Sequence, residues 1–170
     1  PTEAGPAVWC DPKSRRLFEL VEALAAGTLP VLIQGETGVG KEIVARALHA
    51  WSPRRAGPFV AVNCGSLPET LLQNELFGHE KGAFSGAQDA RPGLIEAADG
   101  GTVFLDEVGE SSPRTQAELL RVLDTKRIRR LGSVVERPVD VRFAAATSRT
   151  LEQDVGDGRI RRDFYYRITG

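Results

Sequence analysis

The feature that most constrains the fold is a glycine-rich segment, Gly35-Glu36-Thr37-Gly38-Val39-Gly40-Lys41, which lies between a short apolar run and a helical pattern. Glycines allow the backbone to curl so that its amide groups point inward, toward phosphate oxygens. The N-terminus of the following helix adds its dipole, and Lys41 can reach the outer phosphates. The alternative is a glycine-rich turn with an incidental lysine. The strand pattern before the segment and the helical pattern after it disfavour that alternative. The segment from Gly35 to Glu42 therefore predicts a site for a nucleoside triphosphate, with ATP as the expected ligand.

Magnesium needs other ligands than in most such loops, because Glu42 stands where a serine or threonine usually contacts the ion. The apolar run Thr102–Leu105 ends in two adjacent acids, Asp106 and Glu107. Open α/β sheets bind their ligands at the carboxyl ends of the strands. We therefore expect Asp106 to hold Mg²⁺, directly or through water, and Glu107 to polarise the attacking water. A strand end that is merely solvated is the alternative.

Two further segments allow more than one interpretation. Thr147 and Ser148 end an apolar strand and could sense the terminal phosphate, although an ordinary turn uses the same residue types. Arg159–Arg167 is either a helix with a charged outer face or a source of arginines that reach the nucleotide of a neighbouring subunit. Such an arginine can contribute roughly 10³–10⁵-fold in turnover, so an isolated subunit should be a poor ATPase.

The segment from Gly78 to Ala87 places an aromatic residue between glycines in an otherwise polar stretch. Phe84 fits neither a helical nor a strand face. It either anchors the loop as a hydrophobic plug or is offered, together with Ser85, to a partner. His79 is explained equally well as a hydrogen-bonding residue of the loop and as a catalytic one.

Strand patterns alternate with helical patterns, which indicates one α/β domain over residues 1–170 with a largely parallel sheet covered on both faces. Asp11 followed by Pro12 is typical of a helix start, with Asp11 as the N-cap. We expect helices over 12–26, 42–50, 68–77 and 113–125, strands over 31–34, 59–62, 102–105 and 139–146, and a loop over 78–93.

Composition argues against several other classes of protein. The net charge of −1 disfavours nucleic-acid binding by bulk charge. Two cysteines and two histidines without close spacing predict neither a metal cluster nor a disulfide framework, and Cys64 is expected to be a small core residue. No apolar run approaches the roughly 18 residues of a membrane span, so we expect a cytoplasmic protein without membrane contact. The first residue, Pro1, indicates a piece of a longer protein.

Together these segments resemble the central AAA+ domain of sigma-54-dependent transcriptional activators, the bacterial enhancer-binding proteins. The likeness runs from about Asp11 to Thr169, with the markers GETGVGKE, ELFGHEKGAFSGA, GGTVFLDEVGE and RRDFYYR in that order. The resemblance implies a P-loop NTPase fold, a three-layer α/β/α sandwich around a mostly parallel sheet. It also implies an ATPase that forms a homo-oligomeric ring, usually a hexamer, and remodels the closed complex of RNA polymerase and sigma-54 into an open complex.

The resemblance assigns roles to residues of the nucleotide site by their position. Lys41 corresponds to the lysine of the phosphate loop, and Asp106 and Glu107 correspond to the Walker B pair. Asn63 is similar to a switch residue that holds the catalytic glutamate and reports the state of the γ-phosphate.

Other correspondences lie outside the nucleotide site. Arg161 and Arg167 match arginines that act on a neighbouring subunit, and Glu96 matches an acid that relays the nucleotide state toward a loop. That loop, which contacts sigma-54 in the family, corresponds to Gly82, Ala83, Phe84, Ser85, Gly86 and Ala87. A second, supporting loop resembles Leu123–Gly132, and its basic residues are either a solvated face or a contact to promoter DNA: Lys126, Arg127, Arg129 and Arg130.

Three positions depart from the family pattern. Ser85 replaces a threonine, which keeps the hydroxyl but loses a methyl group and predicts a weaker contact with sigma-54. Ser148 replaces the usual sensor asparagine, so the side chain is shorter and carries no amide. Ile160 replaces a phenylalanine before the first arginine. A helical lid and a helix-turn-helix domain, which would carry most of the DNA binding, are expected beyond Gly170.

Two classes of function follow from these observations. A mechanochemical ATPase that acts on sigma-54 is predicted by the phosphate loop and the Gly82–Ala87 loop together. A nucleotide-dependent interaction switch with little hydrolysis is the alternative, and the departure at Ser148 motivates it. A metabolic kinase is disfavoured, because no second-substrate site is evident in the sequence.

Overall fold

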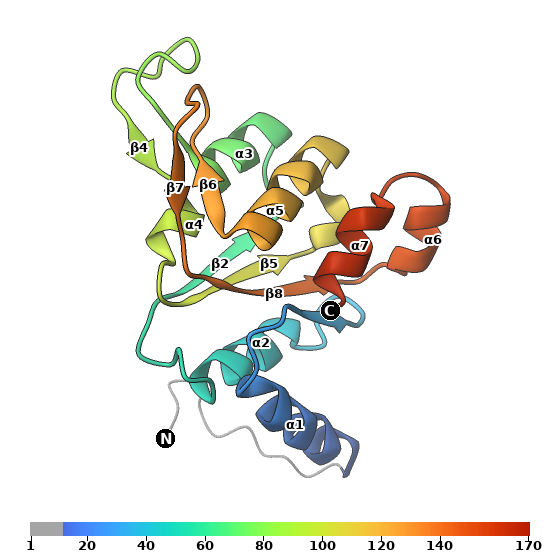
Figure 1. Ribbon diagram of the computed structural model, residues 1–170. Coiled ribbons are helices and arrows are strands. Elements are labelled where there is room, and N and C mark those ends of the chain that lie inside the picture. The colour runs from blue at the N-terminus through green and yellow to red at the C-terminus, as the bar shows by residue number, and fades with distance from the viewer. Residues whose placement is uncertain (1–11) are drawn as a thin grey trace.

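The computed structural model describes residues 12–170, which form a central sheet flanked by helices (Figure 1). Four parallel strands make up the sheet in the order β1-β8-β5-β2, so strands that are distant in sequence are neighbours in space. Their bounds are β1 (Val31–Gln34), β2 (Phe59–Asn63), β5 (Thr102–Asp106) and β8 (Arg142–Thr147). The predicted parallel sheet is confirmed, and the carboxyl ends of its strands lie along one edge.

Helices cover both faces of this sheet (Figure 1). One face carries α1 (Pro12–Ala25) and α2 (Lys41–Ala50). The other face carries α3 (Glu69–Phe77), α4 (Leu94–Ala97), α5 (Pro113–Thr125) and α7 (Arg162–Ile168). The side chains of β5 alternate, because Val103 and Leu105 belong to the larger core and Phe104 belongs to the smaller one with α1 and α2. This is the three-layer α/β/α sandwich that the resemblance implied.

Most of the predicted helix and strand ends agree with the structure to within one residue. The helix after the phosphate loop begins at Lys41, and the strands β2 and β5 each extend one residue further, to Asn63 and Asp106. The helix predicted over 68–77 begins at Glu69, because Pro68 has extended backbone angles and serves as the N-cap. A 3₁₀ turn, η1 (Val108–Glu110), and a short helix, α6 (Leu151–Gly156), complete the elements between β5 and α7. The predicted N-cap Asp11 lies outside the described residues.

The strand predicted over 139–146 starts three residues too early, since β8 begins at Arg142, while its end at Thr147 agrees to within one residue. The backbone of residues 139–141 bonds elsewhere: Val139 N donates to Lys126 O at 3.0 Å, and Asp140 O accepts from Gly100 N at 2.9 Å. Val139 and Val141 are nevertheless buried. Their burial explains why the apolar pattern extended the prediction toward the N-terminus.

The segment predicted as a loop over 78–93 is pinned at its base. The short strands β3 (Gly78–His79) and β4 (Arg91–Pro92) pair antiparallel there. A second hairpin, formed by β6 (Arg127–Arg129) and β7 (Glu136–Pro138), lies beside it (Figure 1). The two are joined by Leu131, whose N donates to Gly78 O at 3.0 Å and whose O accepts from Glu80 N at 3.0 Å.

A buried cation fastens α1 to the sheet. Arg142, on β8, is 3% exposed, and its guanidinium donates to three carbonyl oxygens at the end of α1 and the following turn. These are Ala25 O at 2.8 Å, Leu24 O at 2.7 Å and Leu29 O at 3.3 Å. The guanidinium thereby binds backbone carbonyls at the C-terminal end of α1, where the helix itself supplies no further donors.

Cys64 is a core residue, as predicted, with 3% of its surface exposed. Burial, reinforced by the negative charge of Asp106, raises the pKa of its thiol to about 12, so the thiol stays protonated and inert. In the part of the chain that the structure covers, no helix combines the length and the apolar character needed to pass through a bilayer.

Gly93 generates a prediction about the base of the loop. A Cβ added at Gly93 would lie 2.4 Å from Gly78 N and 2.4 Å from Leu76 O, closer than real Cβ atoms approach backbone. We expect Gly93→Ala to lower the free energy of unfolding by about 1–3 kcal/mol or more. At Gly156, in α6, an added Cβ would meet no atom within 4 Å, so Gly156→Ala should be neutral or stabilising. Chemical denaturation of both variants measures the difference, and equal stability would contradict the close backbone crossing.

Candidate functional site

The predicted phosphate loop connects the carboxyl end of β1 to the first residue of α2. Gly38 and Gly40 have φ angles of 84° and 93°, in the left-handed region where a side chain introduces strain. Gly35 N donates to Thr147 O at 3.1 Å, which anchors the start of the loop to the adjacent strand β8. The loop therefore directs the N-terminus of α2 toward the edge of the sheet where the strands end, as an anion site requires.

Lys41 is 7% exposed, and its ammonium group has three oxygen partners. Nζ donates to Gly35 O at 2.9 Å, to Glu36 O at 3.3 Å and to Glu107 Oε1 at 3.1 Å. The first two bonds close the phosphate loop upon itself, and the third crosses to the end of β5. Phosphate oxygens would have to replace at least one of these partners.

Asn63 holds Asp106 in this structure. Its Nδ2 donates to Asp106 Oδ2 at 3.1 Å, and its Oδ1 accepts from Gly65 N at 2.9 Å. The resemblance implied a contact between Asn63 and Glu107, and the structure corrects that contact. The reason is the parallel register, which sets Asn63 directly beside Asp106 across β2 and β5.

Glu107 follows the strand with a left-handed φ of 49°, which is uncommon for a residue with a side chain. Its carboxylate lies 3.1 Å from Lys41 Nζ, and Oε2 accepts from Ser148 N at 3.0 Å and Ser148 Oγ at 2.8 Å. Partial burial alone would raise the pKa of Glu107, but the bonds from Ser148 and the interaction with Lys41 lower it below its usual value. The group is therefore an ionised carboxylate at neutral pH, the form that can polarise a water molecule.

Thr147 and Ser148 have different places at the end of β8. Thr147 is buried, and its Oγ1 accepts from Arg149 N at 3.1 Å, so it belongs to the scaffold. Ser148 is exposed and reaches Glu107 with both its hydroxyl and its backbone amide. Of the two residues predicted as phosphate sensors, only Ser148 binds a residue of the acidic pair.

The carboxylates at the end of β5 have the chemistry that Mg²⁺ prefers. This ion binds oxygen ligands and usually keeps several waters beside one or two carboxylates and the phosphates of a substrate. Asp106 and Glu107 fit that description. Glu42 pairs instead with Arg46 at 2.6 Å on the exposed side of α2, so its side chain lies outside this set. Within residues 12–170, no three His, Cys, Asp or Glu side chains gather into a metal cluster, so nucleotide phosphates and water would have to complete the coordination.

The loop Gly82–Ala87 is folded tightly on itself. Gly82 N donates to Ala87 O at 2.9 Å, and Ala87 N donates to Phe84 O at 3.1 Å. The ring of Phe84 packs against His79 with centroids 5.1 Å apart, yet 46% of the residue remains exposed. His79 in turn hydrogen-bonds to Asn74 at 2.6 Å. Phe84 thus combines features of both interpretations, since it anchors the loop and still presents apolar surface.

Glu96 is connected to the base of this loop through Arg130. The guanidinium of Arg130 donates to both carboxylate oxygens of Glu96, at 2.7 Å and 2.8 Å, and lies 3.4 Å from Glu80. Arg137 also pairs with Glu80, at 3.1 Å. Hydrogen bonds from Arg130 to Glu96 raise the pKa of this guanidinium and outweigh its partial burial. The relay role that the resemblance implied for Glu96 stays a prediction, and sequence reasoning gave Glu80 and Arg137 no role in this network.

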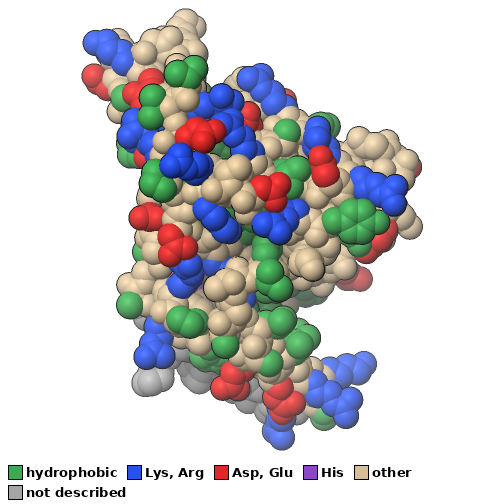
Figure 2. Space-filling model, viewed as in Figure 1, with side chains coloured by type: hydrophobic (Ala, Val, Ile, Leu, Met, Phe, Trp, Pro, Cys, Tyr) green, Lys and Arg blue, Asp and Glu red, His purple; other side chains and the backbone are tan. Residues whose placement is uncertain are grey.

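The basic run over 126–130 is unevenly paired, since Arg130 is bound closely while Lys126 and Arg127 are exposed. Arg130 is 13% exposed and bound to Glu96, while Arg127 and Arg129 lie 3.9 Å and 4.0 Å from Glu136 and Glu118. Lys126 caps the end of α5, with its backbone N bonded to Val122 O. Figure 2 shows basic and acidic side chains intermixed over the hairpin of β6 and β7.

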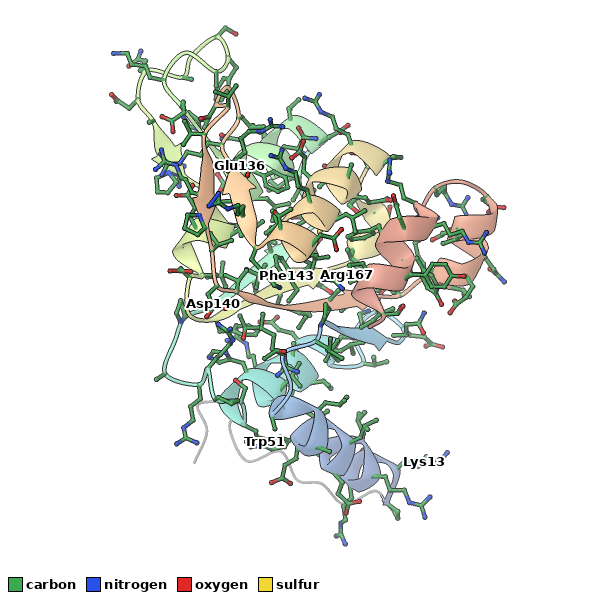
Figure 3. The ribbon with its side chains drawn as sticks, viewed as in Figure 1. Lys13, Trp51, Glu136, Asp140, Phe143 and Arg167 are labelled. Carbon is green, nitrogen blue, oxygen red and sulfur yellow. The ribbon has the colours of Figure 1, made fainter. Side chains whose placement is uncertain are left out.

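Arg161 and Arg167 lie at α7, on the opposite face of the sheet from the phosphate-loop helix α2 (Figure 1). Arg161 pairs with Asp163 at 2.7 Å, and Arg167 pairs with Asp124 at 2.8 Å beside α5, where Figure 3 labels it. The structure therefore does not bring these arginines to Lys41 and Glu107 of the same chain. Arg161 and its neighbours line an open depression of about 590 Å³.

One buried polar residue that supports this region was missed by sequence reasoning. Gln116 lies in α5 with no exposed surface, and its Oε1 accepts from Arg161 N at 2.8 Å. Its Nε2 donates to Ser111 O at 2.8 Å and Arg159 O at 3.0 Å. The side chain thus fixes the backbone that leads into α7. A glutamine three residues before Leu119, on the buried face of an amphipathic helix, was the available signal.

Comparisons with known proteins agree with this geometry. Residues 8–170 match a family model described as the Sigma-54 interaction domain. A Nif-specific regulatory protein of Azotobacter vinelandii is 53% identical over 157 residues, which cover 92% of this chain and 30% of that protein. A Sigma54-dependent transcriptional regulator of Pseudomonas fluorescens is 52% identical over 161 residues, covering 95% of this chain and 44% of that protein. The structure of NtrX from Brucella abortus in complex with ATP is similar, with a TM-score of 0.86, 35% identity, and coverage of 94% of this chain and 34% of that one.

The chain spans less than half the length of each of these three relatives. The family match nevertheless covers the phosphate loop, the acids at the end of β5, the Gly82–Ala87 loop and the arginines of α7. On these grounds, the chain belongs to the Sigma-54 interaction domain family.

Proposed function

We propose that this chain is the ATP-hydrolysing domain of a transcriptional activator that contacts sigma-54 and remodels the closed complex of RNA polymerase into an open complex. The observation that carries the proposal is the convergence of Lys41, Asp106 and Glu107 beside the phosphate loop. The match to the Sigma-54 interaction domain supports the choice of partner. Because RNA polymerase works in the cytoplasm, the proposal includes a cytoplasmic location.

ATP with Mg²⁺ is the proposed ligand of the site. The similar NtrX structure was solved in complex with ATP, and the phosphate loop of this chain leads into the N-terminus of α2, which favours an anionic ligand. Asp106 would hold the ion, and Mg²⁺ would neutralise charge on the β- and γ-phosphates. Asn63 keeps the Asp106 carboxylate oriented through its hydrogen bond of 3.1 Å.

Glu107 is the proposed activating group for water. Ser148 donates to Oε2 of the Glu107 carboxylate and Lys41 donates to Oε1, so Oε1 can accept a proton from a water molecule, or orient it, once Lys41 has turned away. Lys41 would exchange its bond to Glu107 for phosphate oxygens. The same exchange would make the catalytic carboxylate available only when nucleotide is bound.

The active site is completed in the proposal by a second copy of the chain. Arg161 and Arg167 contact neither Lys41 nor Glu107 of their own chain, so in this proposal they act on the nucleotide of a neighbour, in a ring that is usually a hexamer in this family. Their present partners, Asp163 and Asp124, are about half exposed, so these ion pairs cost little to break.

The Gly82–Ala87 loop is the proposed contact to sigma-54. Phe84 presents an exposed aromatic surface at its tip, and Ser85 adds a hydroxyl. The chain of contacts from Glu96 through Arg130 to Glu80 gives a physical connection between the sheet region and the base of the loop.

Replacing the proposed activating group tests hydrolysis directly. We expect Glu107→Gln to retain ATP binding but to lower turnover by about 10²–10⁴-fold, because an amide of the same size cannot accept a proton. Glu22→Gln, an exposed acid on α1, serves as the matched control and should hydrolyse ATP like the wild type. Steady-state turnover and binding of a fluorescent ATP analogue are the measurements. Full turnover in Glu107→Gln would refute the assignment.

The dependence of ATP turnover on subunit assembly distinguishes a mechanochemical ATPase from a nucleotide switch with little hydrolysis. We expect ATP turnover per subunit of the wild type to rise with protein concentration, since an arginine supplied by a neighbour can contribute roughly 10³–10⁵-fold. Arg161→Ala and Glu107→Gln should each be nearly inactive, and their mixture should recover part of the activity, because only mixed rings combine an intact acid with an intact arginine. Flat, near-zero turnover of the wild type at every concentration would favour the switch.

If the Gly82–Ala87 loop contacts sigma-54, a change in the loop should uncouple ATP hydrolysis from open-complex formation. Phe84→Ala should keep ATP turnover and lose open-complex formation with the sigma-54 polymerase in the full-length protein. Leu71→Ala, an exposed apolar residue of α3, is the control and should keep both activities. Phe84→Ala also removes the ring contact with His79, which is worth about 0.5–1.5 kcal/mol. Thermal melting of the variant measures this loss of stability separately from its activity. Open complexes formed normally by Phe84→Ala would show that the loop is not the contact.

A further inference from the structure

Asp154, on α6, is the only buried aspartate or glutamate among residues 12–170, with 2% of its surface exposed. Two arginines bind its carboxylate. Arg159 Nε donates to Asp154 Oδ1 at 2.8 Å, and Arg149 Nε lies 2.9 Å from Asp154 Oδ2. The proposed function, as described above, gives this buried cluster no role.

The turn between α6 and α7 is held from two sides. On one side, Asp154 O accepts from Arg159 N at 2.9 Å and from Ile160 N at 3.1 Å. On the other side, Gln116 of α5 accepts from Arg161 N at 2.8 Å and donates to Arg159 O at 3.0 Å. Ile160, between the two arginines, is 2% exposed. The three residues that lead into α7 therefore have contacts with both neighbouring helices.

Arg149 connects Asp154 to the edge of the sheet where the strands end. It directly follows Ser148, and its backbone N donates to Thr147 Oγ1 at 3.1 Å. Its guanidinium donates to Glu110 Oε1, in η1, at 2.9 Å. The carboxylate of Asp154 is thus fixed relative to β8 and η1, and Arg159 is fixed relative to that carboxylate.

The burial of Asp154 calls for a reason other than stability. A buried ion pair is weak evidence for stability, because well-packed apolar side chains of similar volume stabilise a protein as well or better. In some proteins such a pair selects one arrangement of the chain instead. Arg161 has only an exposed partner, Asp163, and exposed ion pairs hold a side chain weakly. The direction in which Arg161 is presented therefore depends on the backbone that precedes it.

We infer that Asp154 is a positioning residue for Arg161: through Arg159 it fixes the turn from which that arginine reaches the nucleotide of a neighbouring subunit. This inference rests on the proposed function, in which Arg161 acts within a ring. Misplacement of a catalytic group by about 1 Å can cost roughly 10²-fold in rate. Release of the turn from Asp154 would misplace Arg161 and leave the acids at the end of β5 in place.

The first experiment measures amide hydrogen exchange in the nucleotide-free, full-length protein. Asp154→Asn removes the charge but keeps the shape, and we expect exchange in residues 157–161 to become about three- to tenfold faster, because Arg159 loses a charged partner. Asp157→Asn is the matched control, since it removes the exposed partner of the same guanidinium and should exchange like the wild type. Unchanged exchange in Asp154→Asn, or equal acceleration in Asp157→Asn, overturns the inference.

The second experiment uses mixed rings to identify which half of the site is impaired. We expect Asp154→Asn to lower kcat about 10- to 100-fold in the full-length protein, with binding of a fluorescent ATP analogue unchanged. A mixture with Glu107→Gln, which keeps a well-placed arginine, should recover part of the activity. A mixture with Arg161→Ala should not, because neither copy then supplies such an arginine. Arg159→Gln alters the same contact at a residue that is about half exposed, and it should show the same pattern.

Each other result of the mixing experiment counts against the inference. Recovery with Arg161→Ala would place the defect on the side of the acids, and no recovery in either mixture would indicate a general loss of folding or assembly. Both results overturn the positioning role. If the wild type itself fails to hydrolyse ATP at every concentration, the proposed function fails, while the exchange measurement still tests whether Asp154 holds the turn.

Discussion

The parallel register of β5 between β2 and β8 is the constraint on which the rest of the site depends. It sets Asn63 beside Asp106 and brings the end of β8, with Ser148, to Glu107. The loop after β1 reaches the same edge because β1 pairs in parallel with β8. Groups from four separate strands therefore meet at one place, as open α/β sheets generally arrange their ligand sites. An antiparallel neighbour on either side of β5 would carry its polar end to the opposite edge.

The charged groups of the site are paired with one another and with nearby polar groups. Lys41 has three oxygen partners, and Glu107 has a cation on one side and two N–H or O–H donors on the other. A nearly buried cation and a partly buried carboxylate would each be costly if left unpaired. Nucleotide binding, in the proposed function, therefore exchanges one set of partners for another. The left-handed φ of Glu107 is the local strain that this arrangement tolerates.

The far end of the molecule is organised by a different set of charges. Arg130 joins Glu96, on α4, to Glu80, at the base of the Gly82–Ala87 loop, and the backbone of Leu131 bonds to Gly78 and Glu80 on the N-terminal side of the same loop. These contacts tie two hairpins into one unit that projects from the sheet (Figure 1). Since Arg130 is largely buried and fully engaged, it supports the loop mechanically and is not free to bind an external anion.

The sequence by itself determined the phosphate loop, the acids after β5, the three-layer fold and most helix and strand ends, because each depends on local periodicity or on a short contiguous motif. The family resemblance extended this to Glu96 and the Gly82–Ala87 loop. Only the tertiary structure decided which partner each polar side chain takes: Asn63 binds Asp106 rather than Glu107, and Ser148 binds Glu107. Likewise, only the structure showed that Arg130 is buried and paired and that residues 139–141 leave the strand. Such choices are set by strand register and by contacts between residues far apart in the chain, and a one-dimensional pattern carries neither.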